Sequence, residues 1–235
     1  MIPPLALRHE VPLRQELHKL IQAAKQQVKL LEASPVESLP RSRGVLQYAP
    51  TRYAPTLDEL RQKVIGCTLC DLHRGRTHAV FGEGNPRAAL MFIGEGPGRE
   101  EDRQGRPFVG MAGQLLTKII EAIQFHREDV YIANIVKCRP PENRVPFPME
   151  IASCRPYLVS QIEQIKPRII CALGKTAAWA LLNTAIPISQ LRGRWFECQG
   201  IPMMPTFHPA YLLRNPQDKR LVWEDMKKIR QALDE

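Results

Sequence analysis

The chain has 235 residues, of which 44% are hydrophobic, and this length suits one globular domain with some additional chain. Its formal net charge of +9 favours a polyanion such as nucleic acid as partner, although simple solubility also explains the excess. Because no apolar run reaches about eighteen residues and the N-terminal segment is too short and charged for a signal peptide, we expect no membrane span and a cytoplasmic location.

The first 55 residues are predicted to be an appendage to the main domain. Leucine, isoleucine and valine recur near helical spacing over residues 12–32, among charged residues and glutamines, which predicts an amphipathic helix. Residues 34–55 are rich in proline and lack periodicity, which is typical of a linker. Four roles stay open for the helix: docking on the main domain, tethering, self-association, or binding a protein partner.

The main domain is predicted to span residues 56–235. Thr56 and Glu59 fit a capping box, with Thr56 as the N-cap of a helix that leads to Cys67 and Cys70. Apolar runs predict buried strands over residues 88–93, 130–136, 168–173 and 203–207. Amphipathic segments predict helices over residues 112–125, 148–165, 175–182 and 219–233.

Apolar strands that alternate with amphipathic helices indicate an α/β fold. We expect three α/β/α layers, with helices on both faces of a central, mostly parallel four-stranded sheet, plus the N-terminal helical extension. Ligands of such sheets bind at the carboxyl ends of the strands. The glycine-rich turn 94–98, Asn134 and His208 each follow a predicted strand or lie near its end, so the sequence predicts one site at this edge.

Four of the six cysteines form a candidate ligand set on three separate segments: Cys67, Cys70, Cys138 and Cys154. The chain is long, lacks a signal peptide and contains a C-x-x-C pair, which favours metal ligation in a reducing compartment over disulfides. Four thiolates suit either a structural zinc ion or an iron–sulfur cluster. The other two, Cys171 in a predicted strand and Cys198, are interpreted as inert thiols.

The glycine-rich turn does not fit a nucleotide-binding loop. Gly94-x-Gly96-x-Gly98 lacks a third glycine at the required offset and contains Pro97. Gly174-Lys175-Thr176 matches only the end of a phosphate-binding loop, because the upstream glycine is absent. By itself, a turn of this kind is as typical of a tight strand–helix connection as of a functional site.

Three longer motifs are more specific. The turn continues into Pro107-Phe108-Val109-Gly110-Met111-Ala112-Gly113, Asn134 leads into Ile135-Val136-Lys137-Cys138-Arg139-Pro140-Pro141, and the last strand leads into His208-Pro209-Ala210. With the four cysteines and the fifteen residues between Cys138 and Cys154, these motifs closely resemble the iron–sulfur uracil-DNA glycosylases, family 4 of the uracil-DNA glycosylase superfamily. The resemblance covers residues 56–235.

The resemblance implies a monomeric, monofunctional DNA repair enzyme. Such an enzyme flips uracil, the product of cytosine deamination, out of single- or double-stranded DNA and hydrolyses its N-glycosidic bond, leaving an abasic site. The resemblance also implies a 4Fe-4S cluster on the four cysteines. The alternatives are a catalytically silent iron–sulfur module that binds nucleic acid and, third, a zinc-stapled α/β protein. The joint presence of Glu95, Asn134 and His208 argues against a silent module.

The resemblance also assigns roles at the site. Asn134 is expected to read uracil by donating to O4 and accepting from N3–H, and His208 to donate to O2 as negative charge develops there. Family 1 enzymes place a water-orienting Asp where this chain has Gly96, so we assign that role to the neighbouring Glu95. The expected substrate-binding residues are Gly96, Glu101, Phe108, which stacks on the base, and Asn134.

The expected DNA contacts are Leu212, Arg214, Lys137 and Arg139. Leu212, four residues after His208, is interpreted either as a wedge that fills the vacated base stack or as a core leucine. The three basic side chains are expected to hold phosphates and thereby position the strand.

Overall fold

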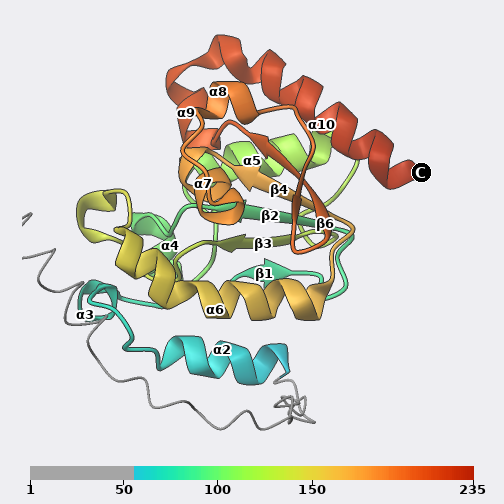
Figure 1. Ribbon diagram of the computed structural model, residues 1–235. Coiled ribbons are helices and arrows are strands. Elements are labelled where there is room, and N and C mark those ends of the chain that lie inside the picture. Colours follow the sequence, from blue (N-terminus) through green and yellow to red (C-terminus); the bar gives the residue numbers. More distant parts are fainter. Residues whose placement is uncertain (1–55) are drawn as a thin grey trace, which may run out of the picture. The chain divides into compact units, whose positions relative to one another are not determined.

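A computed structural model of the protein describes residues 56–235 (Figure 1). The helix expected at 12–32 and the linker expected at 34–55 lie outside the described residues, so the domain boundary at residue 56 stays a prediction. The capping box of the first described helix, α2 (Leu57–Ile65), is confirmed. Thr56 Oγ1 accepts a hydrogen bond from the Glu59 N–H at 3.2 Å, and Glu59 Oε2 accepts one from the Thr56 N–H at 2.7 Å.

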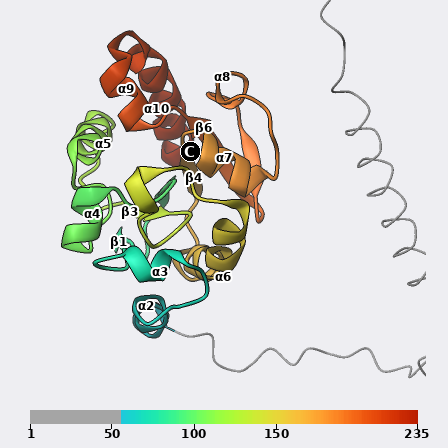
Figure 2. The ribbon, with the colours of Figure 1, turned by 90° about the vertical axis from the view of Figure 1, so that its left-hand side faces the viewer.

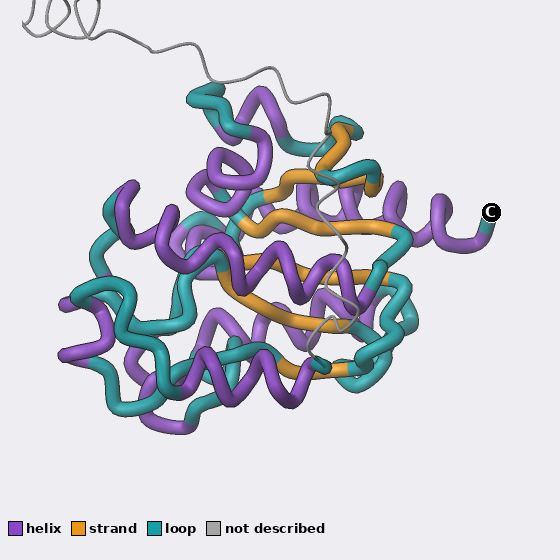
Figure 3. Tube along the Cα trace, turned by 60° about the horizontal axis from the view of Figure 1, so that its bottom comes forward, coloured by secondary structure: helices purple, strands orange, loops and turns teal. Residues whose placement is uncertain are grey.

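The strands form one mixed, mostly parallel sheet of six strands in the order β1-β3-β2-β4-β6-β5 (Figure 3). The strands are β1 (Glu83–Gly84), β2 (Leu90–Gly94), β3 (Tyr131–Asn134), β4 (Ile169–Leu173), β5 (Phe196–Cys198) and β6 (Ile201–Thr206). The four expected strands are confirmed as the central parallel ones, β3, β2, β4 and β6. The expected count of four was wrong, because β1 and β5 add an antiparallel strand at each edge. Both are only partly buried and carry no apolar run that would mark them in the sequence.

The helices predicted over residues 112–125, 148–165, 175–182 and 219–233 are confirmed as α5, α6, α7 and α10. The remaining helices of the described part are α3 (Leu72–Gly75), α4 (Arg99–Gln104), α5 (Met111–Ala122), α6 (Pro148–Ile165), α7 (Lys175–Leu182), α8 (Ile188–Leu191), α9 (Pro209–Arg214) and α10 (Lys219–Asp234), with short 3₁₀ turns η1 (Pro141–Asn143) and η2 (Pro216–Asp218). Among residues 56–235, no helix is both long and apolar enough to span a membrane.

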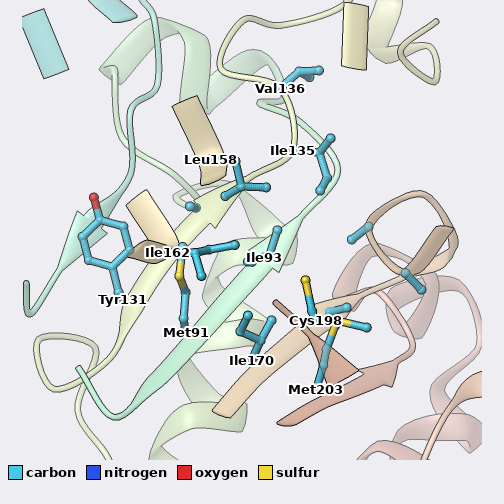
Figure 4. Close-up of a cluster of buried hydrophobic side chains, with 14 of the residues drawn as sticks. Met91, Ile93, Tyr131, Ile135, Val136, Leu158, Ile162, Ile170, Cys198 and Met203 are labelled. Carbon is cyan, nitrogen blue, oxygen red and sulfur yellow. The ribbon is translucent and has the colours of Figure 1, made fainter. Parts of the chain in front are cut away.

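Helices pack on both faces of the sheet. Side chains alternate along β2, so that Met91 and Ile93 belong to the cluster shared with α6 and α7, whereas Leu90 and Phe92 belong to the one shared with α5 and α10. Figure 1 accordingly shows α6 on one side of the strands and α5 and α10 on the other. In the first cluster, the α6 side chains lie against those of the central strands (Figure 4).

The strand register brings the carboxyl ends of the parallel strands to one edge. Gly94 of β2 lies opposite Asn134 of β3, and Leu173 of β4 lies opposite Thr206 of β6. Figure 2 views the strands end-on from this side, with α4, α7 and α9 around their ends. The residues that follow β2, β3, β4 and β6 therefore meet in one region.

Candidate active site and metal centre

A cleft of about 620 Å³ opens at the carboxyl edge of the sheet. Segments that follow all four parallel strands line it, which is the expected place for a ligand in an open α/β sheet. The predicted site residues that line this cleft are Glu95, Gly96, Glu101, Phe108, Asn134, His208 and Arg214.

Asn134 lies at the floor of the cleft with an unused hydrogen-bond acceptor. Its side chain is 1% exposed, and its Oδ1 is, among residues 56–235, the one buried side-chain nitrogen or oxygen without a hydrogen-bond partner. Gly94 makes room for it, because a Cβ at that position would lie 2.5 Å from both Asn134 Oδ1 and Phe108 Cζ. A buried acceptor without a partner is costly, so this oxygen suits a ligand N–H.

Phe108 is held over the cleft by a loop that Glu101 organises. Glu101 Oε1 accepts hydrogen bonds from the N–H groups of Val109 at 2.9 Å and Gly110 at 2.8 Å, and its Oε2 accepts one from the Gly98 N–H at 3.1 Å. Phe108 itself adopts a positive φ of 52°. The Glu101 carboxylate thus joins the glycine-rich turn to the Phe108 loop.

His208 is a neutral hydrogen-bond donor at neutral pH. It follows β6 and caps α9, and its Nδ1 accepts a hydrogen bond from the Ala210 N–H at 3.1 Å. Burial lowers the pKa of the imidazole to about 4; the positive charge of Arg214 adds to the decrease, and the Glu101 carboxylate opposes it. Because Nδ1 is an acceptor, the proton of the neutral ring lies on Nε2, which can donate into the cleft.

Glu95 is oriented by a residue that sequence reasoning missed. Thr176 Oγ1, in the first turn of α7, donates a short hydrogen bond to Glu95 Oε2. The sequence signal that could have identified Thr176 is its position directly after the predicted strand 168–173, at the edge where the other site residues lie. Gly96 lies so close to the segment after β3 that a Cβ on it would lie 2.8 Å from Val136 Cγ2.

Two predicted DNA contacts are wrong. Lys137 is 1% exposed, and its Nζ donates to the main-chain oxygen of Asn134 and to Gln161 Oε1, so it cannot reach a phosphate. Leu212 is 0% exposed and belongs to the core beside α10, whereas the next residue, Leu213, is 42% exposed. Arg139 is partly exposed and its Nε donates to Asn143 Oδ1 at 2.7 Å, so its predicted contact stays untested.

The four predicted ligand cysteines come from three segments and lie close enough to affect one another. Burial raises the pKa of the Cys138 thiol, and Cys70 and Cys67 raise it further. Burial also raises the pKa of Cys154 to about 11, with smaller contributions from Cys138 and Cys70. No three Cys, His, Asp or Glu side chains in residues 56–235 are grouped tightly enough to surround a single metal ion.

Two N–H groups point at sulfur atoms of this set. Arg76 Nη1 donates to Cys138 Sγ at 3.0 Å, and the Lys137 main-chain N–H donates to Cys154 Sγ at 3.3 Å. Such donors favour sulfur that carries negative charge, as in metal-bound thiolates. The donor set therefore fits a thiolate-ligated metal group.

Comparison with known proteins decides the family. Residues 81–227 match the model of the Uracil DNA glycosylase superfamily. A type-4 uracil-DNA glycosylase of Thermotoga maritima is 47% identical over 178 residues, covering 74% of this chain and 93% of that protein. The chain belongs to the type-4 uracil-DNA glycosylases. Another type-4 member, from Archaeoglobus fulgidus, is 42% identical over 182 residues, covering 74% of this chain and 92% of that protein. A type-5 uracil-DNA glycosylase of Pyrobaculum aerophilum is 30% identical over 205 residues, covering 73% of this chain and 89% of that protein. The family expected from the motifs is thus confirmed.

Proposed function

We propose that this protein excises uracil from DNA by hydrolysing its N-glycosidic bond, and that the cleft at the carboxyl edge of the sheet holds the flipped base. One observation supports this assignment above the others: the unpaired Oδ1 of Asn134 lies in the same cleft as the neutral His208. Two polar groups of this kind in one cleft suit a base with an N–H group and carbonyl oxygens.

Base recognition is assigned to Asn134 and Phe108. A uracil in the cleft donates its N3–H to Asn134 Oδ1 and accepts from the Asn134 amide at O4, whereas cytosine presents an acceptor at N3 and a donor at N4. Phe108 stacks on the extruded base, a contact worth about 1–3 kcal/mol by analogy with base–aromatic stacking. This contact offsets part of the few kcal/mol that base flipping costs.

Leaving-group stabilisation is assigned to His208. Cleavage of the N-glycosidic bond gives the sugar oxocarbenium character and leaves negative charge on the uracil. The Nε2–H of the neutral imidazole donates to uracil O2, and this hydrogen bond strengthens as the charge grows. Because Nδ1 is already engaged by the Ala210 N–H, the ring needs no reorientation or change of tautomer during the reaction.

Water positioning is assigned to Glu95. Its carboxylate lies at the cleft on the segment after β2. It accepts one hydrogen bond, from the Thr176 hydroxyl, which leaves acceptor sites for a water molecule. A water held there attacks the anomeric carbon as the bond from that carbon to the base breaks; the electron pair of the broken bond leaves with the uracil, and the water gives up a proton to the Glu95 carboxylate. Arg214, which lines the same cleft, is assigned to a DNA phosphate.

A 4Fe-4S cluster is assigned to Cys67, Cys70, Cys138 and Cys154. The fit rests on the all-thiol donor set and on the N–H groups of Arg76 and Lys137 that point at its sulfur atoms. When bound, the cluster supplies no bond-making chemistry to the hydrolysis and serves as a link between chain segments. Cys138 is four residues after Asn134, so a cluster on this set would link the base-reading end of β3 to α6, which carries Cys154.

The function is tested on an oligonucleotide with one uracil. Purified protein should release uracil and leave a site at which the strand breaks only after alkali treatment. The variant His208→Ala should slow single-turnover release by roughly 10²–10³-fold, the usual loss for a donor to a developing oxyanion. A protein that binds this DNA and leaves the uracil in place would instead be the silent iron–sulfur module.

A further inference from the structure

Lys137 lies between the base-reading residue and the cysteine set, and the proposed chemistry does not use it. Its side chain is buried, and its Nζ donates to the Asn134 main-chain oxygen at 2.9 Å and to Gln161 Oε1 at 2.5 Å. Its main-chain N–H donates to Cys154 Sγ at 3.3 Å. One residue therefore contacts the end of β3 and two positions on α6.

The α6 partners of Lys137 are fixed in place. Cys154 and Gln161 are seven residues apart, about two helical turns, so they lie on one face of α6. Gln161 is buried, and its Nε2 donates to the Phe81 main-chain oxygen at 2.9 Å and to Tyr131 Oη at 3.3 Å. Two other side chains of α6, Leu158 and Ile162, lie between Tyr131 of β3 and Ile135 in Figure 4. Lys137 thus has a rigid support on the helix side.

Burying this ammonium group is costly unless its hydrogen bonds compensate. Within residues 56–235, no carboxylate oxygen lies within 4.0 Å of the Lys137 ammonium. Two buried carboxylates, by contrast, each have a cationic partner: Asp225 pairs with Arg192 and Glu150 with Arg144. Burying a lysine without a carboxylate partner is more costly than burying an apolar side chain of similar shape. Its two neutral oxygen acceptors are therefore the contacts that position it, and a charge-assisted bond to a carbonyl is stronger than a neutral one.

The carbonyl that Lys137 holds belongs to the residue that meets the base. Asn134 Oδ1 has no hydrogen-bond partner of its own, so its position depends on packing against Phe108 and Gly94 and on the main chain. A hydrogen bond to the main-chain oxygen of the same residue fixes that main chain against α6. If this bond were lost, the Asn134 side-chain amide could shift without breaking a hydrogen bond to its Oδ1, because that oxygen accepts none.

We propose that Lys137 is a positioning residue for base recognition, which holds the Asn134 main chain against α6 so that Oδ1 meets the uracil N3–H. This inference rests on the proposed role of Asn134 in reading the base. Lys137 also links α6 to the base pocket, because its main-chain N–H contacts Cys154 of that helix.

A double-mutant cycle tests the proposal. Lys137→Met keeps the length of the stem and removes the donor, and it should slow single-turnover uracil release by roughly 10–100-fold, as misplacement of a reacting group does. In the Asn134→Ala background the same change should slow release less than about twofold, because there is no amide left to position. Lys118→Met, at an exposed position of α5, is the matched control and should match the wild-type rate.

Binding to non-cleavable DNA gives a second readout that is independent of turnover. A duplex with 2′-fluoro-deoxyuridine should bind Lys137→Met more weakly than wild type, and the two Asn134→Ala proteins, with and without Lys137→Met, should bind it equally. Iron content per chain should stay at the wild-type value in all variants. If Lys137→Met does not accumulate as folded protein, Lys137→Gln replaces it in the same cycle.

Equal slowing by Lys137→Met in both backgrounds would overturn the proposal, because it would mean a general structural effect. No slowing in the wild-type background would overturn it as well. A wild-type rate in Asn134→Ala would contradict a different claim. Asn134 would then have no role in base recognition, whereas the proposed excision of uracil would be unaffected.

Discussion

The rings of Phe108 and His208 lie 5.6 Å apart between centroids and are inclined by 32°. Phe108 is carried by a loop that the Glu101 carboxylate ties to the glycine-rich turn, and His208 is fixed by the first turn of α9. The two groups that we assign to stacking and leaving-group stabilisation are thus positioned by separate, hydrogen-bonded supports before any base enters.

The buried state of His208 should make stability depend on pH. Burial lowers its folded-state pKa to about 4, whereas an unfolded chain has its ordinary value of about 6.5. Above pH 6.5 both states are neutral at this ring; as the pH falls from 6.5 toward 4, only the unfolded state binds the proton, so this contribution to stability is lost. Urea unfolding should therefore show a larger loss between pH 7 and pH 5 for wild type than for His208→Ala.

The control for this prediction is His126→Ala, which removes an exposed histidine that does not line the cleft. It should keep the wild-type pH dependence. If His208→Ala lost as much stability as wild type over the same interval, the imidazole would not be held neutral by the fold.

Adjacent leucines on α9 should behave in opposite ways. Leu212→Ala removes a fully buried side chain and should lower the free energy of unfolding by about 2–5 kcal/mol. Leu213→Ala should leave stability nearly unchanged and slow uracil release from duplex more than from single-stranded DNA. This leucine is exposed and directly precedes Arg214, which lines the cleft, so it is the better wedge. The measurements are urea unfolding and single-turnover rates on both substrates. Equal rates for wild type and Leu213→Ala on the duplex would remove Leu213 from the DNA contacts.

The pair of leucines also shows what the sequence could and could not predict. Periodicity predicted the central strands, and position after the strands placed the glycine-rich turn, Asn134 and His208 at one edge of the sheet. The roles of Glu95, Asn134 and His208 are expectations from the resemblance. The number of residues after a motif does not predict which way a side chain points. The leucine predicted as a possible wedge, Leu212, is therefore buried, and the next residue, Leu213, is the exposed one. Lys137 looked like a phosphate contact for the same reason, since a lysine is rarely buried without an ion pair.

Other features depend on contacts between distant segments. The bond from Thr176 to Glu95 joins residues 81 positions apart, which only the folded sheet brings together. The edge strands β1 and β5 are too short to carry a period-two pattern, and their pairing depends on the neighbouring strands.

Arg214 should contribute one phosphate contact. The logarithm of DNA affinity should fall linearly with the logarithm of salt concentration, with a slope of about −0.9 per neutralised phosphate on duplex DNA. Arg214→Ala should reduce the magnitude of that slope by about one without changing base preference, since the contact carries no sequence information. Fluorescence anisotropy across a salt series measures both, and an unchanged slope would exclude the contact.

The cluster assignment predicts the metal content of the protein. Purified protein should contain about four iron and four sulfide per chain, and stoichiometric zinc in protein prepared anaerobically from iron-replete cells would contradict the assignment.

Arg76 should raise the reduction potential of the cluster. Its Nη1 donates to Cys138 Sγ, so Arg76→Met removes a positive charge and a hydrogen bond that stabilise the more negative, reduced state. The reduction potential should therefore fall. Arg74→Met, at a side chain that is 76% exposed, is the control and should leave the potential unchanged.

The most direct test of the account is a change of acceptor and donor at Asn134. In Asn134→Asp the amide donor that meets uracil O4 becomes a carboxylate, which repels that oxygen and any negative charge that develops on the base. We predict that this variant loses most uracil release in single-turnover assays and gains at most a trace of cytosine release, greatest at mispaired or single-stranded cytosine, which costs less to extrude. A folded, cluster-loaded Asn134→Asp protein that releases uracil at the wild-type rate would contradict the account, because Asn134 would then not read the base.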